Sequence, residues 1–314
     1  MKLVALGNTE ILVSRLCFGT LTMGPLQKNM PLHEGVALLE LAFSLGVNFL
    51  DTAELYGTYP YIREALKIKP DAVVCTKSYA YDHSTAEQSL KLAMEGIGRE
   101  YIDVFMLHEQ ESEHTIRGHY EAIEYFQRKK EEGLIGAIGL STHHINGMVG
   151  ANKYDEIEAV FPIINKAGLG IADGSLEQMQ KQISISYEKG KGIIAMKPLG
   201  GGHLIKDRLD AFSYLLDDSR MHSIAVGMQT KEEVLFDCAL FSGEDIEESL
   251  LGKIDMNERR LLIHDWCEGC GRCVKRCKNK ALTVQDGQAR VDHDKCVLCG
   301  YCAATCPQFC IKVI

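Results

Sequence analysis

The sequence predicts a (β/α)8 barrel followed by a small cysteine-rich α+β domain. Two observations lead to this prediction. Apolar runs of strand length alternate with amphipathic runs of helix length along most of the chain. Nine of the twelve cysteines, by contrast, fall within the last 48 of the 314 residues. We therefore expect a barrel over residues 1–242, a helical linker over 243–265 and a second domain over 266–314.

The predicted strands end at regular intervals, which indicates eight repeating units. The strand ends fall near Gly19, Asp51, Lys77, His108, Ser141, Asn165, Lys197 and Gly227. Successive intervals are 32, 26, 31, 33, 24, 32 and 30 residues, each with room for one strand, one helix and two short loops. A doubly wound open sheet shares this alternation, but no Gly-x-Gly-x-x-Gly follows the first strand and eight units exceed its usual number. The barrel is therefore favoured.

The other elements follow from turn and capping residues. Residues 2–13 are expected to form a hairpin with Gly7-Asn8 as its turn. Expected helices cover residues 34–45, 85–97, 119–132 and 175–189, and then 231–241, 244–251 and 256–265. Ser84 or Thr85 would cap the second of these helices, and Gly133 and Gly190 would end the third and the fourth.

Four polar side chains near strand ends are candidates for catalysis. Asp51, Lys77 and His108 end three successive strands, and Tyr56 follows Asp51 by five residues. Since the carboxyl ends of barrel strands share one rim, these groups should meet. A carbonyl reduced by hydride needs a proton, and an ammonium beside a tyrosine lowers the pKa of that donor. Each residue alone has an ordinary structural interpretation, but four at this spacing indicate a site.

These residues lie in motifs that resemble those of the aldo-keto reductase superfamily. The matching segments are Phe49 to Gly57, Val74 to Lys77 and Val104 to His108, in order and in register with the strand count. The resemblance covers about residues 1–240. It implies a small carbonyl or alcohol substrate. It also implies Tyr56 as proton donor, Lys77 and Asp51 as groups that adjust its pKa, and His108 as a neutral imidazole that orients the substrate oxygen.

The same resemblance implies a nicotinamide cofactor, NAD(H) or NADP(H), held by other strand ends. Ser141 and Asn165 would contact the carboxamide, and the glycine-rich segment from Pro198 would approach the pyrophosphate. The full set of expected cofactor contacts is Gly19, Thr20, Ser141, Asn165, Met196, Lys197, Pro198, Leu199, Gly200 and Gly227.

Three departures from the family pattern affect these expectations. Met196 stands where many relatives carry the tyrosine that stacks on nicotinamide, so a sulfur contact would replace it. Gly227 and Glu233 fall where NADPH-selective relatives carry basic residues, which favours NADH, although Lys231 is near. The long C-terminal substrate loop of many relatives is missing. Glutamates at 109, 111 and 113 make an anionic substrate less favoured, in a pocket expected to be lined by residues 21–31, Tyr79, Tyr81, residues 109–118, His143 and His144.

The last domain carries the bacterial two-cluster ferredoxin pattern. Two runs have the spacing Cys-x2-Cys-x2-Cys-x3-Cys, and in this pattern the fourth cysteine of each run binds the other cluster. Zinc sites usually take separated cysteine pairs, so two [4Fe-4S] clusters are favoured. A hairpin is expected between the runs, with Asp286-Gly287 as its turn. Cluster one would use Cys267, Cys270, Cys273 and Cys306, and cluster two Cys296, Cys299, Cys302 and Cys277. Cys310 is not expected to be a ligand.

Composition excludes several functions. The net charge is -9, but residues 266–314 carry eight Lys or Arg against four Asp or Glu, a balance that two anionic clusters would offset. Nucleic-acid binding is therefore not expected, and neither a membrane span nor a signal peptide is recognisable, so we expect a cytoplasmic protein. Cys17, Cys75 and Cys238 are expected to be buried packing thiols.

Two functional hypotheses remain at this stage. The first is a nicotinamide-dependent oxidoreductase whose clusters are structural, exchange electrons with a ferredoxin or other redox partner, or sense redox state. The second is an electron-transfer or redox-sensing protein on a barrel that no longer catalyses. The sequence does not determine the oligomeric state.

Overall fold

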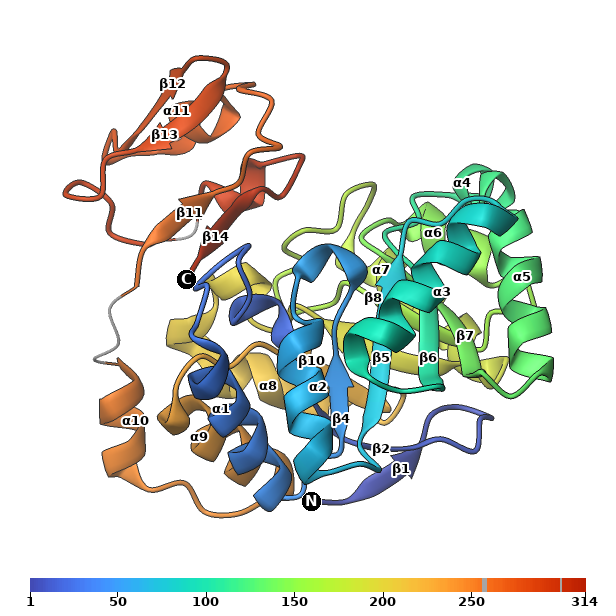
Figure 1. Cartoon of the computed structure of the whole chain (residues 1–314). Coiled ribbons are helices and arrows are strands. Elements are labelled where there is room, and N and C mark those ends of the chain that lie inside the picture. Colours follow the sequence, from blue (N-terminus) through green and yellow to red (C-terminus); the bar gives the residue numbers. More distant parts are fainter. Residues whose placement is uncertain (256–258, 300) are drawn as a thin grey trace.

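The computed structural model describes residues 1–255, 259–299 and 301–314 and shows a closed eight-stranded parallel barrel (Figure 1). Each barrel strand pairs with the next in chain order, and β10 closes the ring on β3. The strands are β3 (Leu16–Gly19), β4 (Phe49–Asp51), β5 (Val73–Ser78), β6 (Ile102–Leu107), β7 (Ile135–Thr142), β8 (Ala159–Pro162), β9 (Gly192–Met196) and β10 (Ser223–Val226). The predicted barrel is confirmed.

Helices surround the barrel and connect its strands. They are α1 (Leu32–Ser44), α2 (Tyr59–Ile68), α3 (His83–Ile97), α4 (Glu113–Gly118), α5 (Tyr120–Glu131), α6 (Ile145–Ala151), α7 (Leu176–Glu188), α8 (Arg208–Leu216) and α9 (Lys231–Ser242). Short 3-10 turns follow several strands, namely η1 (Thr20–Thr22), η2 (Glu54–Tyr56), η3 (Gly200–Gly202) and η4 (Ile205–Asp207).

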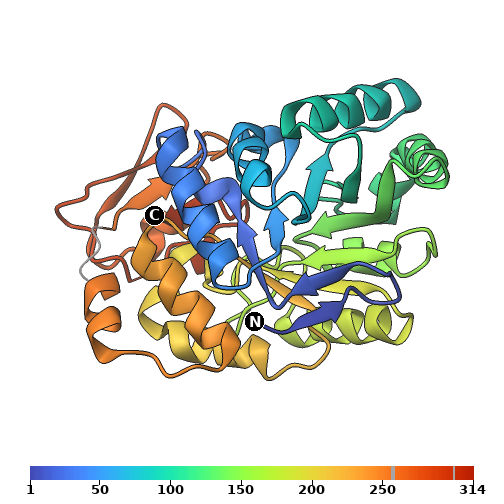
Figure 2. The ribbon, with the colours of Figure 1, turned by 60° about the horizontal axis from the view of Figure 1, so that its bottom comes forward.

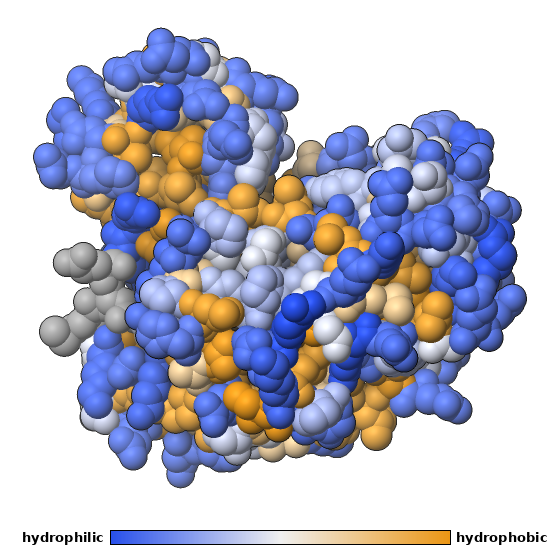
Figure 3. All heavy atoms as spheres, in the orientation of Figure 1, coloured by the Kyte–Doolittle hydropathy of each residue, from blue (hydrophilic) through white to orange (hydrophobic). Residues whose placement is uncertain are grey.

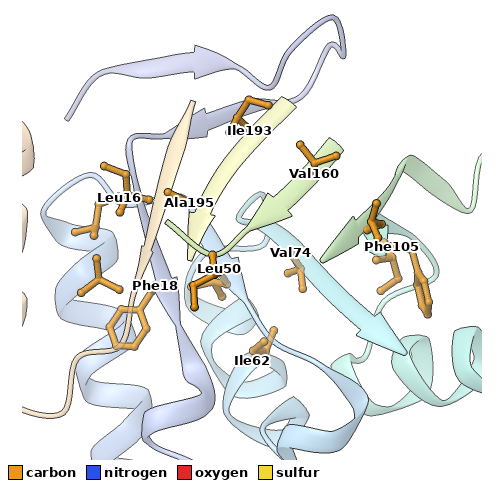
Figure 4. Close-up of a cluster of buried hydrophobic side chains, with 14 of the residues drawn as sticks. Leu16, Phe18, Leu50, Ile62, Val74, Phe105, Val160, Ile193 and Ala195 are labelled. Carbon is orange, nitrogen blue, oxygen red and sulfur yellow. The ribbon is translucent and has the colours of Figure 1, made fainter. Parts of the chain in front are cut away.

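Alternation along the strands divides the apolar core into two layers. Phe49, Cys75 and Met106 belong to the cluster inside the barrel. Leu50 and Phe105 face outward and pack in the larger cluster under the helices, part of which is drawn in Figure 4. Successive side chains of a strand point to opposite faces, so the same alternation decides which residues at the strand ends point into the barrel.

The N-terminal hairpin lies at the end of the barrel opposite the second domain (Figures 1 and 2). Its strands β1 (Leu3–Ala5) and β2 (Leu12–Ser14) pair antiparallel, as predicted. Leu6 and Val13 are fully buried and extend the interior cluster. Gly7 has φ 61, and a Cβ there would meet Gly192 N at 2.3 Å, so the turn requires glycine.

Helix starts differ from the predictions in two places. Asp82, rather than Ser84 or Thr85, caps α3, since its carboxylate accepts a hydrogen bond from Thr85 N at 2.8 Å. The single helix expected from residue 119 is preceded by a short one, α4. Ser112 caps this helix with a capping box, in which its hydroxyl accepts a hydrogen bond from Thr115 N and the Thr115 hydroxyl accepts one from Ser112 N.

The linker prediction is partly wrong. The helix expected over 244–251 appears as α10 (Glu248–Asp255). A further helix was expected over 256–265, and residues 256–258 lie outside the described chain. The later part contains a strand, β11 (Leu261–Ile263), which pairs antiparallel with β14 (Ile311–Val313). Long-range pairing decides this segment, so it belongs to the C-terminal sheet rather than to a helical linker.

The C-terminal domain is a small α+β unit with an internal repeat. Its other elements are α11 (Arg272–Arg276), β12 (Leu282–Gln285), β13 (Gln288–Val291) and η5 (Ala303–Thr305). The hairpin β12–β13 forms as predicted, with positive φ at Asp286 and Gly287. Positive φ also recurs at equivalent places of the two cysteine runs, three residues after the fourth cysteine, at Lys280 and at Phe309. These reversals turn the chain away from the clusters in both halves.

The C-terminal domain lies over the barrel at the carboxyl ends of its strands. Figure 3 shows it as a separate lobe, with apolar side chains where it meets the barrel. His203 Nε2 lies 3.0 Å from Ile311 O, and a Cβ added to Gly202 would meet Val313 O at 2.1 Å. Arg259 also forms an ion pair with Glu233 of α9 at 2.7 Å. Strand β14 therefore packs directly against the glycine-rich loop after β9.

Candidate active site and cluster sites

Strand phase brings Asp51, Lys77 and His108 to the barrel interior. Each lies two residues beyond a side chain of the interior cluster on the same strand, so all three point the same way. Lys77 Nζ donates to Asp51 Oδ1 at 2.5 Å and to Thr52 O at 2.8 Å. The exposed fractions of the Lys77 and Asp51 side chains are 2% and 8%, so this is a buried ion pair.

Tyr56 and His108 complete the predicted group of four. The Lys77 ammonium lies 5.1 Å from the centre of the Tyr56 ring. The Tyr56 and His108 rings meet edge to face, with their centres 5.7 Å apart. Tyr79 stacks on the other side of His108 at 4.7 Å and donates its hydroxyl to Glu109 Oε2 at 3.1 Å. The four residues are thus brought together, and Tyr79 fixes the plane of the imidazole.

Burial controls the protonation of these groups. Burial raises the pKa of Tyr56, and Lys77 is the main influence that lowers it. Lys77 therefore acts on the pKa of Tyr56 in the expected direction, but burial has the larger effect and the pKa stays above its ordinary value. Burial would lower the pKa of Lys77, but Asp51 and Tyr56 raise it above its ordinary value. Burial, Lys77 and Lys197 hold the pKa of His108 well below its usual range, so the imidazole is neutral, as expected.

The four residues open into a cavity of about 680 Å³ at the carboxyl end of the barrel. Within the described chain, neither ring nitrogen of His108 has a hydrogen-bond partner, and Nδ1 is fully buried. Several of the expected substrate-pocket residues line the cavity, namely Leu21, Thr22, Leu26, Gln27, Tyr79, Glu109, Glu111, His143 and His144. Tyr81 is not among its lining residues.

Seven of the ten expected cofactor contacts line the same cavity. They are Gly19, Ser141, Met196, Lys197, Pro198, Leu199 and Gly227. Gly200 does not line it, whereas its neighbours Gly201 and Gly202 do. The cofactor site expected from the family motifs and the group of four catalytic residues thus share one cavity.

The side chains of Thr20 and Asn165 are placed differently from the predictions. Thr20 is one residue out of phase with Gly19, and its hydroxyl donates to Asp51 O at 2.9 Å behind the cavity wall. Asn165 is fully buried, and its amide holds its own loop by donating to Leu169 O at 2.9 Å and accepting from Leu169 N at 3.0 Å. In this structure neither side chain is available to a ligand.

The cavity has a second wall that sequence reasoning missed. It comes from the C-terminal domain and includes His264, Trp266, Phe309 and Lys312. His264 and Trp266 stack with their ring centres 4.0 Å apart. The sequence lacks the long C-terminal substrate loop of many relatives, and this difference could have indicated the second wall. A barrel without that loop leaves its mouth open to the neighbouring domain.

The predicted ligands of cluster one lie around one small cavity. They are Cys267, Cys270, Cys273 and Cys306, and Ala289 N donates to Cys267 Sγ at 3.4 Å. Hydrogen bonds of this kind tune cluster thiolates. Cys310 lines the same cavity, with its Sγ 3.4 Å from Cys306 Sγ.

The predicted ligands of cluster two share one feature with those of cluster one, a backbone N–H that donates to a cysteine sulfur. Ala281 N donates to Cys277 Sγ at 3.3 Å, which mirrors the contact at Cys267. Burial, with a smaller effect of the nearby Cys296 and Cys299 thiols, raises the pKa of Cys302 to about 12. Cys277, Cys296 and Cys302 pack in the apolar cluster of this domain, while Cys299 is exposed. Cys17, Cys75 and Cys238 are buried in the barrel, as predicted.

Comparison with known proteins identifies both parts of the chain. The aldo/keto reductase family model matches residues 15–248. The chain belongs to the aldo/keto reductase family. A 4Fe-4S dicluster domain matches residues 261–307 of this aldo/keto reductase, which is therefore an oxidoreductase with an iron–sulfur domain.

Individual relatives of this aldo/keto reductase are distant. L-galactose dehydrogenase of Arabidopsis thaliana is 26% identical over 217 residues, 65% of this chain and 67% of the relative. NADH-specific methylglyoxal reductase of Escherichia coli is 26% identical over 198 residues, 53% of this chain and 61% of the relative. The solved holo structure of an aldo-keto reductase from Bacillus halodurans superposes with a TM-score of 0.66 at 19% identity, covering 81% of this chain and 95% of its own. At that identity the superposition supports the fold alone.

The described part of the chain contains no helix that is both long and apolar enough to cross a membrane.

Proposed function

We propose that this protein transfers a hydride between a nicotinamide dinucleotide and a small carbonyl or alcohol substrate. The observation that carries the proposal is the presence of Asp51, Tyr56, Lys77 and His108 in a single cavity with seven expected cofactor contacts. When bound, the reduced nicotinamide supplies the hydride to the carbonyl carbon. The protein must then supply a proton to the carbonyl oxygen and hold that oxygen in place.

Tyr56 is the proton donor in this proposal. Burial favours the phenol form of Tyr56, so its proton is present when the substrate arrives. The Lys77 ammonium favours the phenolate that forms when the proton leaves, and Asp51 and Thr52 O hold that ammonium in place. His108 is neutral and has no ring partner in the described chain, so it can hydrogen-bond the substrate oxygen.

We further propose that NADH is preferred over NADPH. Gly227 and Glu233 both line the cavity, and the carboxylate would repel a 2'-phosphate. Arg259 forms an ion pair with Glu233 at 2.7 Å, which offsets part of that repulsion. The E. coli relative that is named as NADH-specific supports the same preference.

The proposed role of the two clusters is to hold the C-terminal segment against the barrel. The apolar core of this domain is small and includes its own cysteines, so it depends on cluster binding for stability. Bound clusters also supply one-electron chemistry. Exchange with a ferredoxin or other redox partner, and redox sensing, are the competing roles. Cys270→Ala would decide between them, because a structural role predicts that loss of cluster one loosens the contact of this domain with the barrel, whereas electron exchange or redox sensing predicts loss of that cluster from a domain that keeps its place.

Tyr56→Phe tests the catalytic proposal directly. The variant should lower NADH-dependent carbonyl reduction by about 10²- to 10⁴-fold and leave the visible absorbance of the clusters unchanged. Tyr81→Phe is a matched control, since Tyr81 is 55% exposed and does not line the cavity. Undiminished turnover in Tyr56→Phe would instead favour an electron carrier on a barrel that does not catalyse.

A further inference from the structure

Two lysines that the proposed mechanism does not use line the catalytic cavity. Lys197 follows β9 in the barrel, and Lys312 lies on β14 of the C-terminal domain. The Phe309 ring lies between them, with its centre 5.3 Å from Lys197 Nζ and 3.2 Å from Lys312 Nζ. Residues 115 positions apart in the sequence thus place two ammonium groups on one aromatic ring.

Backbone geometry directs Lys197 into the cavity. The residue is one position out of phase with Met196, but its φ of 57 reverses the chain at the strand end. Its Nζ then lies 2.6 Å from His143 Nε2. His143 Nδ1 lies 3.6 Å from Glu109 Oε1, and Glu109 is the residue next to His108. The side chain of Lys197 is therefore on the His108 side of the cavity, whereas its backbone carbonyl faces Asn165.

Lys312 faces the catalytic cavity, although its charge also acts on Cys306, a predicted ligand of cluster one. The neighbouring Ile311 lines the cluster cavity, while Lys312 lines the catalytic cavity, as alternation along a strand requires. The exposed fraction of Lys312 is 7%, and its Nζ donates to Phe309 O. A Cβ added to Gly201 would meet Lys312 Cδ at 2.9 Å, so the side chain crosses the glycine-rich loop.

Neither ammonium has an acidic partner among the residues that the structure describes. Lys77, buried in the same cavity, shows the contrast, because Asp51 lies 2.5 Å from it. The partners of Lys197 and Lys312 are an imidazole, a carbonyl and an aromatic ring, all of them neutral. Glu109 is close enough to raise the pKa of both lysines, but no ion pair joins it to either of them in the described part of the chain. Burial lowers the pKa of Lys312 well below its ordinary value and that of Lys197 to about 8, so the described residues do not fully offset the burial of either charge. An anion in the open cavity would offset this desolvation.

We propose that Lys197 and Lys312 form an anion subsite and that the substrate is a carbonyl compound with a carboxylate, or the matching hydroxy acid. The C-terminal domain thus completes the substrate pocket through Lys312. This inference rests on the proposed hydride-transfer function. It reverses the weak expectation, drawn from three glutamates in one loop, that an anionic substrate is disfavoured.

The position of Lys197 favours the substrate over the cofactor as the source of the anion. His143 and Glu109 link it to His108, which is expected to hold the reacting oxygen. Lys312, however, also crosses the loop where a pyrophosphate is expected. The affinity for NADH is therefore measured alongside the affinity for the substrate.

The experiment compares a 2-oxo acid with its neutral ester, namely phenylglyoxylate and methyl phenylglyoxylate. Wild type should prefer the acid, and Lys312→Met should raise the KM for the acid by about 10- to 100-fold with little change for the ester. Because Lys197 is also an expected cofactor contact, Lys197→Met is judged by the ratio of the KM for the acid to that for the ester, which should rise by a similar factor. Lys312→Arg should keep most of the preference. Lys181→Met on the exposed face of α7 is the matched control. Cluster absorbance is recorded for every variant to show that the domain is intact.

Direct binding separates this inference from the proposed function. Benzoate should bind wild type in calorimetry and compete with the ester, and Lys312→Met should weaken both effects by about tenfold or more. Equal effects on acid and ester, or a loss confined to NADH binding, would overturn the substrate subsite while leaving hydride transfer intact. Benzoate binding without any carbonyl reduction would support the subsite and contradict the proposed function. If Lys312→Met loses its clusters, Lys197→Met in the barrel carries the same test.

Discussion

The buried pair of Lys77 and Asp51 makes the sharpest prediction about catalysis. Asp51→Asn keeps the shape of the side chain but removes its charge at 2.5 Å from Lys77 Nζ. Removing one partner of a buried pair costs about 3–5 kcal/mol, and at 1.36 kcal/mol per pKa unit this lowers the pKa of Lys77 by about 2–4 units. The sign follows because Asp51 stabilises the charged form of Lys77, whereas burial destabilises it.

The assay is the pH profile of kcat/KM for carbonyl reduction, which reports groups of the free enzyme. In wild type Lys77 stays charged across the alkaline range, because its pKa is raised. In Asp51→Asn the pKa of Lys77 should lie about 2–4 units below its wild-type value, so the alkaline limb should appear at a lower pH than in wild type. Asp71→Asn, which removes an exposed carboxylate 3.1 Å from Lys69, is the control. An alkaline limb at the same pH in wild type and Asp51→Asn would refute the proposed role of this pair.

Three further predictions follow from the other parts of the site. Glu233→Gln should raise kcat/KM for NADPH by about 5- to 10-fold and leave that for NADH nearly unchanged, and an unchanged ratio of the two would exclude this residue as the selectivity determinant. Cys299→Ala should lower the iron content by about half, whereas Cys310→Ser should leave it unchanged; iron loss in the latter would make Cys310 a ligand. Burial lowers the pKa of Lys197 to about 8 and that of Lys312 well below its ordinary value, so the preference for an oxo acid over its ester should decline as the pH rises and should have lost the contribution of Lys197 above about pH 8. The titratable and charged groups that face Lys197 are Glu109, His143, Lys77 and Lys312. A pH-independent preference would exclude Lys197 as its source.

The barrel and the group of four could be predicted from the sequence because both depend on local alternation. Every second residue of a strand faces the barrel interior, and these residues are apolar along most of each strand. Asp51, Lys77 and His108 are the next residues in this alternation at the ends of their strands. Cysteine spacing predicted the cluster domain for a comparable reason, since the ligands of each run lie within a few residues of one another.

The incorrect predictions concern contacts that sequence spacing does not determine. Asn165 was expected to reach a ligand, but its loop folds around its own amide. Residues 259–265 were expected to be helical, but β11 forms because β14 lies beside it. Phe309 and Lys312 were not predicted at all, because only the docking of one domain on the other brings them to the active site.

Isotope transfer tests the central claim most directly. The protein is incubated under anaerobic conditions with NADH stereospecifically deuterated at C4 and with phenylglyoxylate or its ester, and the alcohol product is examined by mass spectrometry. Direct hydride transfer predicts one deuterium on the carbinol carbon of each product molecule with one of the two labelled faces, and none with the other. Unlabelled product from both labelled faces would show that electrons reach the substrate by another route, such as the clusters, and would contradict the account.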